Sequence, residues 1–230
     1  WALFRKEKQF VKGMLYVMIP MVALSLIMFG IQEHFDYLSV LSYISKHGET
    51  YWPNQSLNGI LNRVRVGAYT SGFDPNSFAR YHIIVHMGTL ISSALLIFFA
   101  FMYKPKWLRN NKGEVNDHER LFDFVTIIIV STIASPVAWE HHYGVFWPIF
   151  IISFIAITNI LFKNRNKETI GLFVILGTSY LLVSNLIDYF VSTENFVPLN
   201  LLQSYIFYGG LILLAFITIL RKNYSLENRT

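Results

Sequence analysis

A short stretch near the middle of the chain groups the residues best suited to polar chemistry. It runs Trp139, Glu140, His141, His142 and Tyr143. Paired imidazoles can donate hydrogen bonds or positive charge to an anionic group such as a lipid phosphate. Because the stretch follows an apolar run directly, we expect it to lie at the mouth of a membrane cavity. The alternative is an ordinary interfacial turn, in which the aromatic residues belong to a membrane belt.

A second polar stretch, Asn54, Gln55 and Ser56, lies earlier in the chain and is followed by Arg63. Asn54 is a good N-cap, so a short helix is predicted from 55 to 66. Its apolar residues recur at helical spacing on one face: Leu57, Ile60, Leu61 and Val64. Arg63 lies on another face, and its planar guanidinium can bind two phosphate oxygens at once. The alternative for this cation is simple headgroup binding.

A metal site is a rival hypothesis for the histidines. His82 and His86 are four residues apart on one predicted helix face, and His142 could add a third ligand. However, adjacent residues on a helix, such as His141 and His142, are not expected to point the same way, and the chain has no H-E-x-x-H motif. The chain also has no cysteine, which excludes thiolate ligands and thiol nucleophiles. We therefore expect no metal.

The elements that position these residues are predicted to be membrane helices. Hydrophobic residues make up 53% of the chain and charged residues 14%, against roughly 25% charged in soluble domains. Six apolar runs approach the length of about 20 residues that a membrane crossing requires. They cover residues 14–31, 83–103, 121–139, 145–162, 169–187 and 199–220. The sequence therefore predicts an all-α polytopic membrane protein, with one transmembrane domain over residues 1–230.

The basic residues orient these six spans. Of the 19 Lys and Arg residues, all but four lie at one set of span ends. The four exceptions are Lys46, Arg63, Arg65 and Arg80. The positive-inside rule then places both termini in the cytoplasm and residues 32–82 outside. This loop is long enough to suggest a function, and residues 35–44 are predicted to form a short interfacial helix within it. The net charge of +5 thus reflects topology, and no nucleic-acid partner is expected.

The two polar stretches resemble glycosyltransferase family 87, the polyprenyl-phosphate-mannose-dependent mannosyltransferases of prokaryotic membranes. The matching segments are Asn54-Gln55-Ser56-Leu57-Asn58-Gly59 with Arg63, and Ser135-Pro136-Val137-Ala138-Trp139-Glu140-His141-His142-Tyr143. The family pattern in the second segment is S-P-x-S-W-x-H-H, from which this chain departs at Ala138. The resemblance implies a GT-C-like fold with an extracytoplasmic cleft. It covers about the C-terminal half of such an enzyme, so we expect this chain to be the C-terminal part of a longer one.

The resemblance also implies an activity. A hexosyl group, mannosyl in the family, would pass from a polyprenyl-phosphate donor to an extracytoplasmic glycolipid or glycan acceptor at the plasma membrane, without a cofactor. It assigns His141, His142 and Arg63 to the donor phosphate. Positioning of the loop or the sugar would fall to Asn54, Gln55, Ser56, Trp139 and Glu140. The family's general base would lie upstream of this chain, and nothing selects a substitute among Asp36, Asp74, Asp188 and the poor candidate Glu140.

Two hypotheses from other classes remain open. A transporter or channel subunit would carry polar residues along its spans. The nearest candidates are Ser131, Thr132, Ser135, Ser179, Ser184 and Asn185. Ser and Thr in membrane helices more often bond across helices. The third hypothesis is an accessory membrane protein or an inactive fragment.

Overall fold

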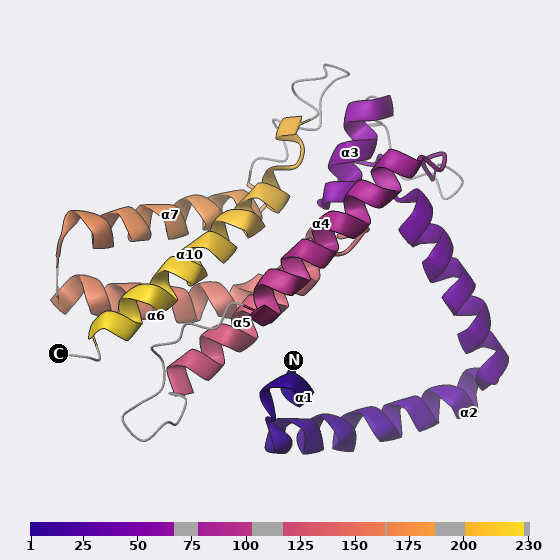
Figure 1. Ribbon diagram of the computed structural model, residues 1–230, viewed down its shortest axis with the longest axis horizontal. Helices are drawn as coiled ribbons and strands as arrows, with labels where there is room; N and C mark the ends of the chain where they lie inside the picture. Colours follow the sequence, from indigo (N-terminus) through magenta and orange to yellow (C-terminus); the bar gives the residue numbers. More distant parts are fainter. Residues whose placement is uncertain (67–77, 103–116, 164, 187–200, 228–230) are drawn as a thin grey trace. The chain divides into compact units, whose positions relative to one another are not determined.

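The computed structural model describes residues 1–66, 78–102, 117–163, 165–186 and 201–227 (Figure 1). These residues form helices and no strand, apart from one isolated bridge between Asn54 and Trp139. The all-α prediction is therefore confirmed for this part of the chain. The chain divides into two compact units, Trp1–Lys46 and His47–Thr230.

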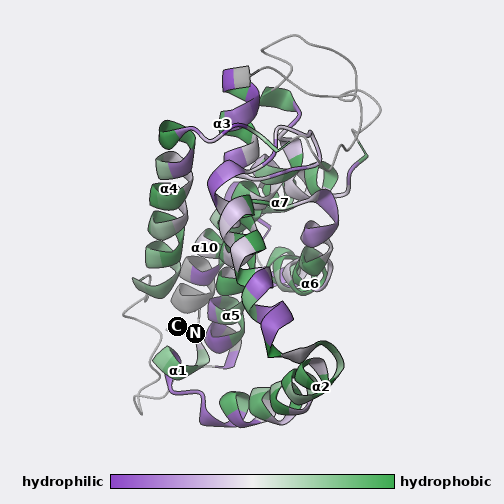
Figure 2. Cartoon of the chain, turned by 90° about the vertical axis from the view of Figure 1, so that its right-hand side faces the viewer, coloured by the Kyte–Doolittle hydropathy of each residue, from purple (hydrophilic) through white to green (hydrophobic). Residues whose placement is uncertain are grey.

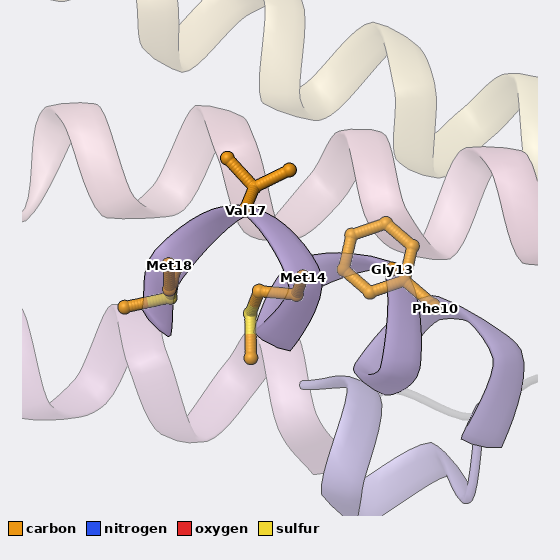
Figure 3. A pocket seen from close by; sticks show the side chains of 5 residues that line it. All are labelled: Phe10, Gly13, Met14, Val17 and Met18. Carbon is orange, nitrogen blue, oxygen red and sulfur yellow. The ribbon is translucent and has the colours of Figure 1, made fainter. Parts of the chain in front are cut away.

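The first unit contains α1 (Ala2–Arg5) and most of α2 (Lys8–His47). Gly30 interrupts α2 with a left-handed φ of 78°, and Figure 1 shows the helix bending along its length. The predicted span 14–31 ends at this break. The predicted interfacial helix at 35–44 is helical, but it is the continuation of α2. No residue of α2 is buried, and Figure 3 shows an apolar hollow on it around Gly13 and Met14.

The second unit is a bundle whose core lies between its C-terminal helices. Its elements are α3 (Leu57–Val66), α4 (Ile83–Met102), α5 (Asp117–Ile133), the 3-10 helix η1 (Glu140–Phe146), α6 (Trp147–Lys163), α7 (Lys167–Val183) and α10 (Tyr205–Glu227). Helix α10 packs against both α7 and α5, and α6 packs against α7. Helix α4 packs against α3 and α5, and in Figure 2 it is hydrophobic over most of its surface. Fully buried side chains such as Ile129, Phe146 and Phe216 fill the centre.

Three helical segments within the described residues are long and apolar enough to cross a membrane: Lys8–His47, Ile83–Met102 and Glu140–Lys163. The segment Tyr205–Arg221 is apolar but shorter. The chain is thus compatible with a membrane protein, while the six predicted spans are matched only in part. The predicted span 121–139 was wrong at its end, because α5 stops at Ile133. Pro136 explains the stop, since the residue before a proline is disfavoured in a helix.

Glycines set the close approach of α10 to α7. A methyl group on Gly209 would lie 2.8 Å from Val183 Cγ2 and 2.9 Å from Leu182 Cβ. The Ser179 hydroxyl donates to the Gly209 carbonyl at 2.8 Å. Small residues that let two backbones approach are typical of helix pairs in membranes. Ser179 was named above as a polar residue that could line a transport path. In the structure its hydroxyl takes part in the packing of α7 against α10.

A buried ion cluster joins α5 to α10. The Arg221 guanidinium, which is 1% exposed, bonds the carboxylate of Glu119 and lies 3.3 Å from Asp123 Oδ1. It also donates to the Thr126 hydroxyl at 3.4 Å. In the sequence, Arg221 served only to orient the predicted spans. Its partners could not be recognised there, because they lie on a helix far away along the chain. In the fold this arginine pairs buried charges that would otherwise be costly.

Candidate functional site

Residues 54–56 bond to the backbone of residues 136–138 through both main-chain and side-chain atoms. Gln55 N donates to Ala138 O at 2.7 Å, and Ala138 N donates to Asn54 Oδ1 at 3.2 Å. The Ser56 hydroxyl donates to Pro136 O at 2.9 Å. We call these contacts between residues 54–56 and 136–139 the loop junction. Segments predicted separately from the sequence thus form one structure.

Residues 54–56 are fully buried within this junction. The Gln55 side chain donates to Trp52 O at 2.8 Å and to Gln203 O at 2.7 Å, and the Gln55 carbonyl accepts from the Tyr143 hydroxyl at 2.5 Å. The predicted cap was wrong, since the Ser56 hydroxyl, not Asn54, accepts from Gly59 N at the start of α3. Because the polar atoms of Asn54, Gln55 and Ser56 bond to other protein groups, these residues stabilise the conformation of the loop.

The His141–His142 pair lies on the surface next to the junction, and both side chains are exposed. Their rings stack with centroids 4.4 Å apart and an interplanar angle of 28°. The expectation that these neighbours diverge was wrong. The reason is a reciprocal cap: His142 N donates to Trp139 O at 2.8 Å, and Trp139 N donates to His142 Nδ1 at 2.9 Å. With Nδ1 accepting, a neutral His142 carries its proton on Nε2, where it can be donated to a ligand.

Glu49 is part of this site, although the sequence analysis did not consider it. Trp139 Nε1 donates to Glu49 Oε2 at 2.7 Å, and the Trp139 ring meets the His141 ring edge-on at 5.7 Å. Glu49 is 7% exposed, and its burial raises the pKa of its carboxyl, an effect that the bond from Trp139 opposes. No spacing signal singled out Glu49, because its partner lies in the other polar stretch. One indole thus joins a buried carboxylate to two exposed imidazoles.

Arg63 is buried, whereas the two imidazoles are exposed. Its side chain is fully buried, and burial lowers its pKa to about 10. Nη1 donates to Asn54 O at 3.0 Å and Tyr51 O at 3.2 Å, and Nη2 donates to Ser204 Oγ at 2.5 Å. The assignment of Arg63 to a donor phosphate stays a prediction: here two loop carbonyls and the Ser204 hydroxyl accept from the guanidinium, and Nε has no partner among the described residues. Arg63 holds the loop that carries Glu49 and Asn54.

The polar face of α3 points inward and anchors the loop further. Asn58 Nδ2 donates to the Thr89 hydroxyl of α4 at 3.2 Å, and Asn62 Nδ2 donates to Asn58 Oδ1 at 2.8 Å and to His47 O at 3.2 Å. Val64, on the apolar face, is 49% exposed. Helical spacing predicted the helix correctly, but it could not show that polar bonds hold this face inside.

Glu140 bonds to a residue that follows the C-terminal end of α7. Its Oε2 accepts from Asn185 Nδ2 at 2.9 Å, and the Tyr205 hydroxyl donates to Asn185 Oδ1. Glu140 and His141 line a hollow of about 170 Å³ with Tyr180. The aromatic wall of this hollow also lines an apolar groove of about 370 Å³ between α6 and α7. His141 therefore lies at the polar end of an apolar surface depression.

The other acidic candidates belong to other segments of the chain. Asp36 lies on α2 in the first unit, where its carboxylate accepts from Gln32 at 3.0 Å. Asp74 and Asp188 lie outside the described residues. Within the described ranges, no group of three or more His, Asp or Glu side chains is arranged to hold a metal ion. His82 and His86 lie at the start of α4, where His86 Nδ1 is 3.5 Å from the Tyr81 hydroxyl.

No family model, curated protein or solved structure matches this chain. The chemistry of the site is therefore argued from its own residues. It offers exposed N–H donors, a flat indole and a buried carboxylate within one small region. This combination suits a ligand that has an anionic group beside several hydroxyl groups.

Proposed function

We propose that this chain belongs to a membrane glycosyltransferase that takes a hexosyl group, mannosyl by resemblance, from a polyprenyl-phosphate donor. The observation that carries the proposal is the loop junction. Two segments that resemble family 87 motifs bond directly to each other and leave His141 and His142 exposed beside them. Packing of the helix core does not explain why two neighbouring imidazoles lie exposed at this surface.

The histidines act on the donor phosphate in this proposal. When the acceptor oxygen attacks the anomeric carbon, the bond from that carbon to the phosphate oxygen breaks, and negative charge develops on the phosphate. The Nε2–H of His142, fixed by the bond from Trp139 N, donates to that charge, and His141 adds a second donor. The residue that takes the acceptor's proton stays unassigned.

The proposed setting is the plasma membrane, with six spans in a GT-C-like arrangement, both ends of the chain in the cytoplasm and the site outside. The apolar groove between α6 and α7 supports a lipid-linked donor, because its wall of Trp147, Phe150 and Tyr180 continues from the hollow beside His141. A hydrocarbon chain gains about 0.8 kcal/mol for each methylene that it buries in such a groove. The acceptor is a glycolipid or glycan on the same side.

The test is transfer by the purified gene product in proteoliposomes that contain polyprenyl-phosphate-mannose with a radiolabelled sugar. His142→Ala is expected to lower kcat/KM about 100- to 1,000-fold, as removal of a preorganised donor does at other sites of developing charge. His86→Ala is the matched control and should retain wild-type turnover. Wild-type turnover by His142→Ala would overturn the proposal. If His86→Ala and a chelator both abolished transfer, the rival metal site would be favoured instead.

A further inference from the structure

Glu49 has one carboxylate oxygen that no described residue engages. Its Oε2 accepts from Trp139 Nε1 at 2.7 Å, and no hydrogen bond within the described residues reaches Oε1. The residue is nevertheless 93% buried, since only 7% of it is exposed. Oε1 is not among the buried side-chain atoms that lack a partner, so it keeps contact with solvent and can accept a hydrogen bond from a ligand.

The groups around Glu49 indicate which ligand would supply it. The Trp139 indole is only partly buried, and the exposed His141 ring is T-shaped to it, with the ring centroids 5.7 Å apart. A pyranose ring has hydroxyl donors on its rim and C–H groups on its faces, so a carboxylate and an indole together match both. A simple cation would need more oxygen ligands than this carboxylate provides.

We infer that Glu49 and Trp139 form a hexosyl subsite, in which Glu49 Oε1 accepts a hydrogen bond from one sugar hydroxyl while the linked phosphate lies at His141 and His142. This inference rests on the proposed function and identifies where the donor's sugar binds. Glu49 is held for this task, because Asn54 Nδ2 donates to its carbonyl at 3.2 Å and Asn54 itself belongs to the loop junction.

The test pairs Glu49→Ala with a series of donors that each lack one sugar hydroxyl. In the wild type, one deoxy donor should lose about 10- to 100-fold in kcat/KM, the effect of an unpaired charged hydrogen bond. Glu49→Ala should lose a similar factor with the intact donor and nothing further with that deoxy donor. An unchanged deoxy penalty in Glu49→Ala would overturn the inference, because a structural role lowers turnover for every donor alike.

Two further arms keep the result interpretable. Glu49→Gln retains an acceptor for Trp139 Nε1, so this variant replaces Glu49→Ala if the latter does not fold. Glu33→Ala removes a carboxylate from the exposed surface of α2 and is the control for the loss of a carboxylate. A parallel series of acceptors that each lack one hydroxyl shows whether Glu49 binds the donor sugar or the acceptor sugar. If Glu49→Ala abolished the deoxy penalty for an acceptor and for no donor, the assignment to the donor would be overturned.

A binding measurement separates this inference from the proposed function. Methyl α-mannoside at millimolar concentration should change the tryptophan fluorescence of the wild type and not that of Trp139→Phe. If the wild type transfers no hexose but binds the glycoside through Trp139, the proposed function fails and the subsite stands. If the wild type transfers hexose and the fluorescence does not respond, the subsite fails and the proposed function stands.

Discussion

A guanidinium has five N–H donors and a permanent charge, so it binds external anions only where the surrounding loop leaves those donors open. At Arg63 the protein engages both terminal nitrogens, while the buried Nε has no partner among the described residues. The carbonyls of Tyr51 and Asn54 and the hydroxyl of Ser204 accept from these two nitrogens. The residue type was compatible with a phosphate ligand and with a structural role, and the burial of the side chain favours the second.

Replacing Arg63 with alanine should therefore act mainly on stability. The change removes the Arg63 donor from the buried Asn54 carbonyl and from the Ser204 hydroxyl, whereas Tyr51 O keeps its bond from Asn54 N. The loss costs about 3 kcal/mol and lowers the melting temperature in detergent. Arg65→Ala is the control, because Arg65 is exposed and its one hydrogen bond within the described residues goes to Arg80 O, so its effect should stay below about 0.5 kcal/mol. A raised KM for the donor with an unchanged melting temperature would support Arg63 as a phosphate ligand.

Glu49 makes stability depend on pH. Burial raises its pKa above the ordinary value of 4.5, so the fold favours the protonated carboxyl. The contribution of Glu49 to stability is complete below pH 4.5 and is lost as the pH rises through the raised pKa of the folded state. The melting temperature of Glu49→Gln relative to the wild type should rise from pH 4 to pH 8. A difference that is constant over this range would contradict the raised pKa.

At the scale of elements, helical periodicity and apolar length predicted most of the helices, because both depend on neighbouring residues. The end of α5 was wrong, since the apolar run continues past Pro136. In the site, the polar residue types were found but their partners were not. Ser56 bonds Pro136, and Glu49 bonds Trp139, across long separations in the chain. No local pattern specifies such pairs.

The contact between α7 and α10 gives an element-scale prediction. Gly209→Ala forces a methyl group against Val183 and Leu182, and such overpacking costs about 1–3 kcal/mol. Gly171→Ala on α7 meets nothing within 4 Å and should be neutral or slightly stabilising. Thermal unfolding of both variants in the same detergent makes the comparison. Equal melting temperatures would show that the two helices can separate without loss.

At the scale of the whole molecule, the absence of cysteine makes the proposed topology directly measurable. Gly144 and Arg165 are exposed and lie beyond opposite ends of α6. In intact cells, a membrane-impermeant maleimide should label Gly144→Cys and should label Arg165→Cys only after the membrane is opened. Labelling of both variants in intact cells would rule out a membrane crossing by α6.

The loop junction relies on the main chain at position 138. Both of its bonds there use the amide and carbonyl of Ala138, and neither uses the side chain. A substitution at position 138 therefore keeps both bonds, but because Ala138 is 1% exposed, only small side chains fit there. A change at Asn54 removes the side-chain oxygen itself. Searches for distant kin of this chain should weight Asn54 above Ala138.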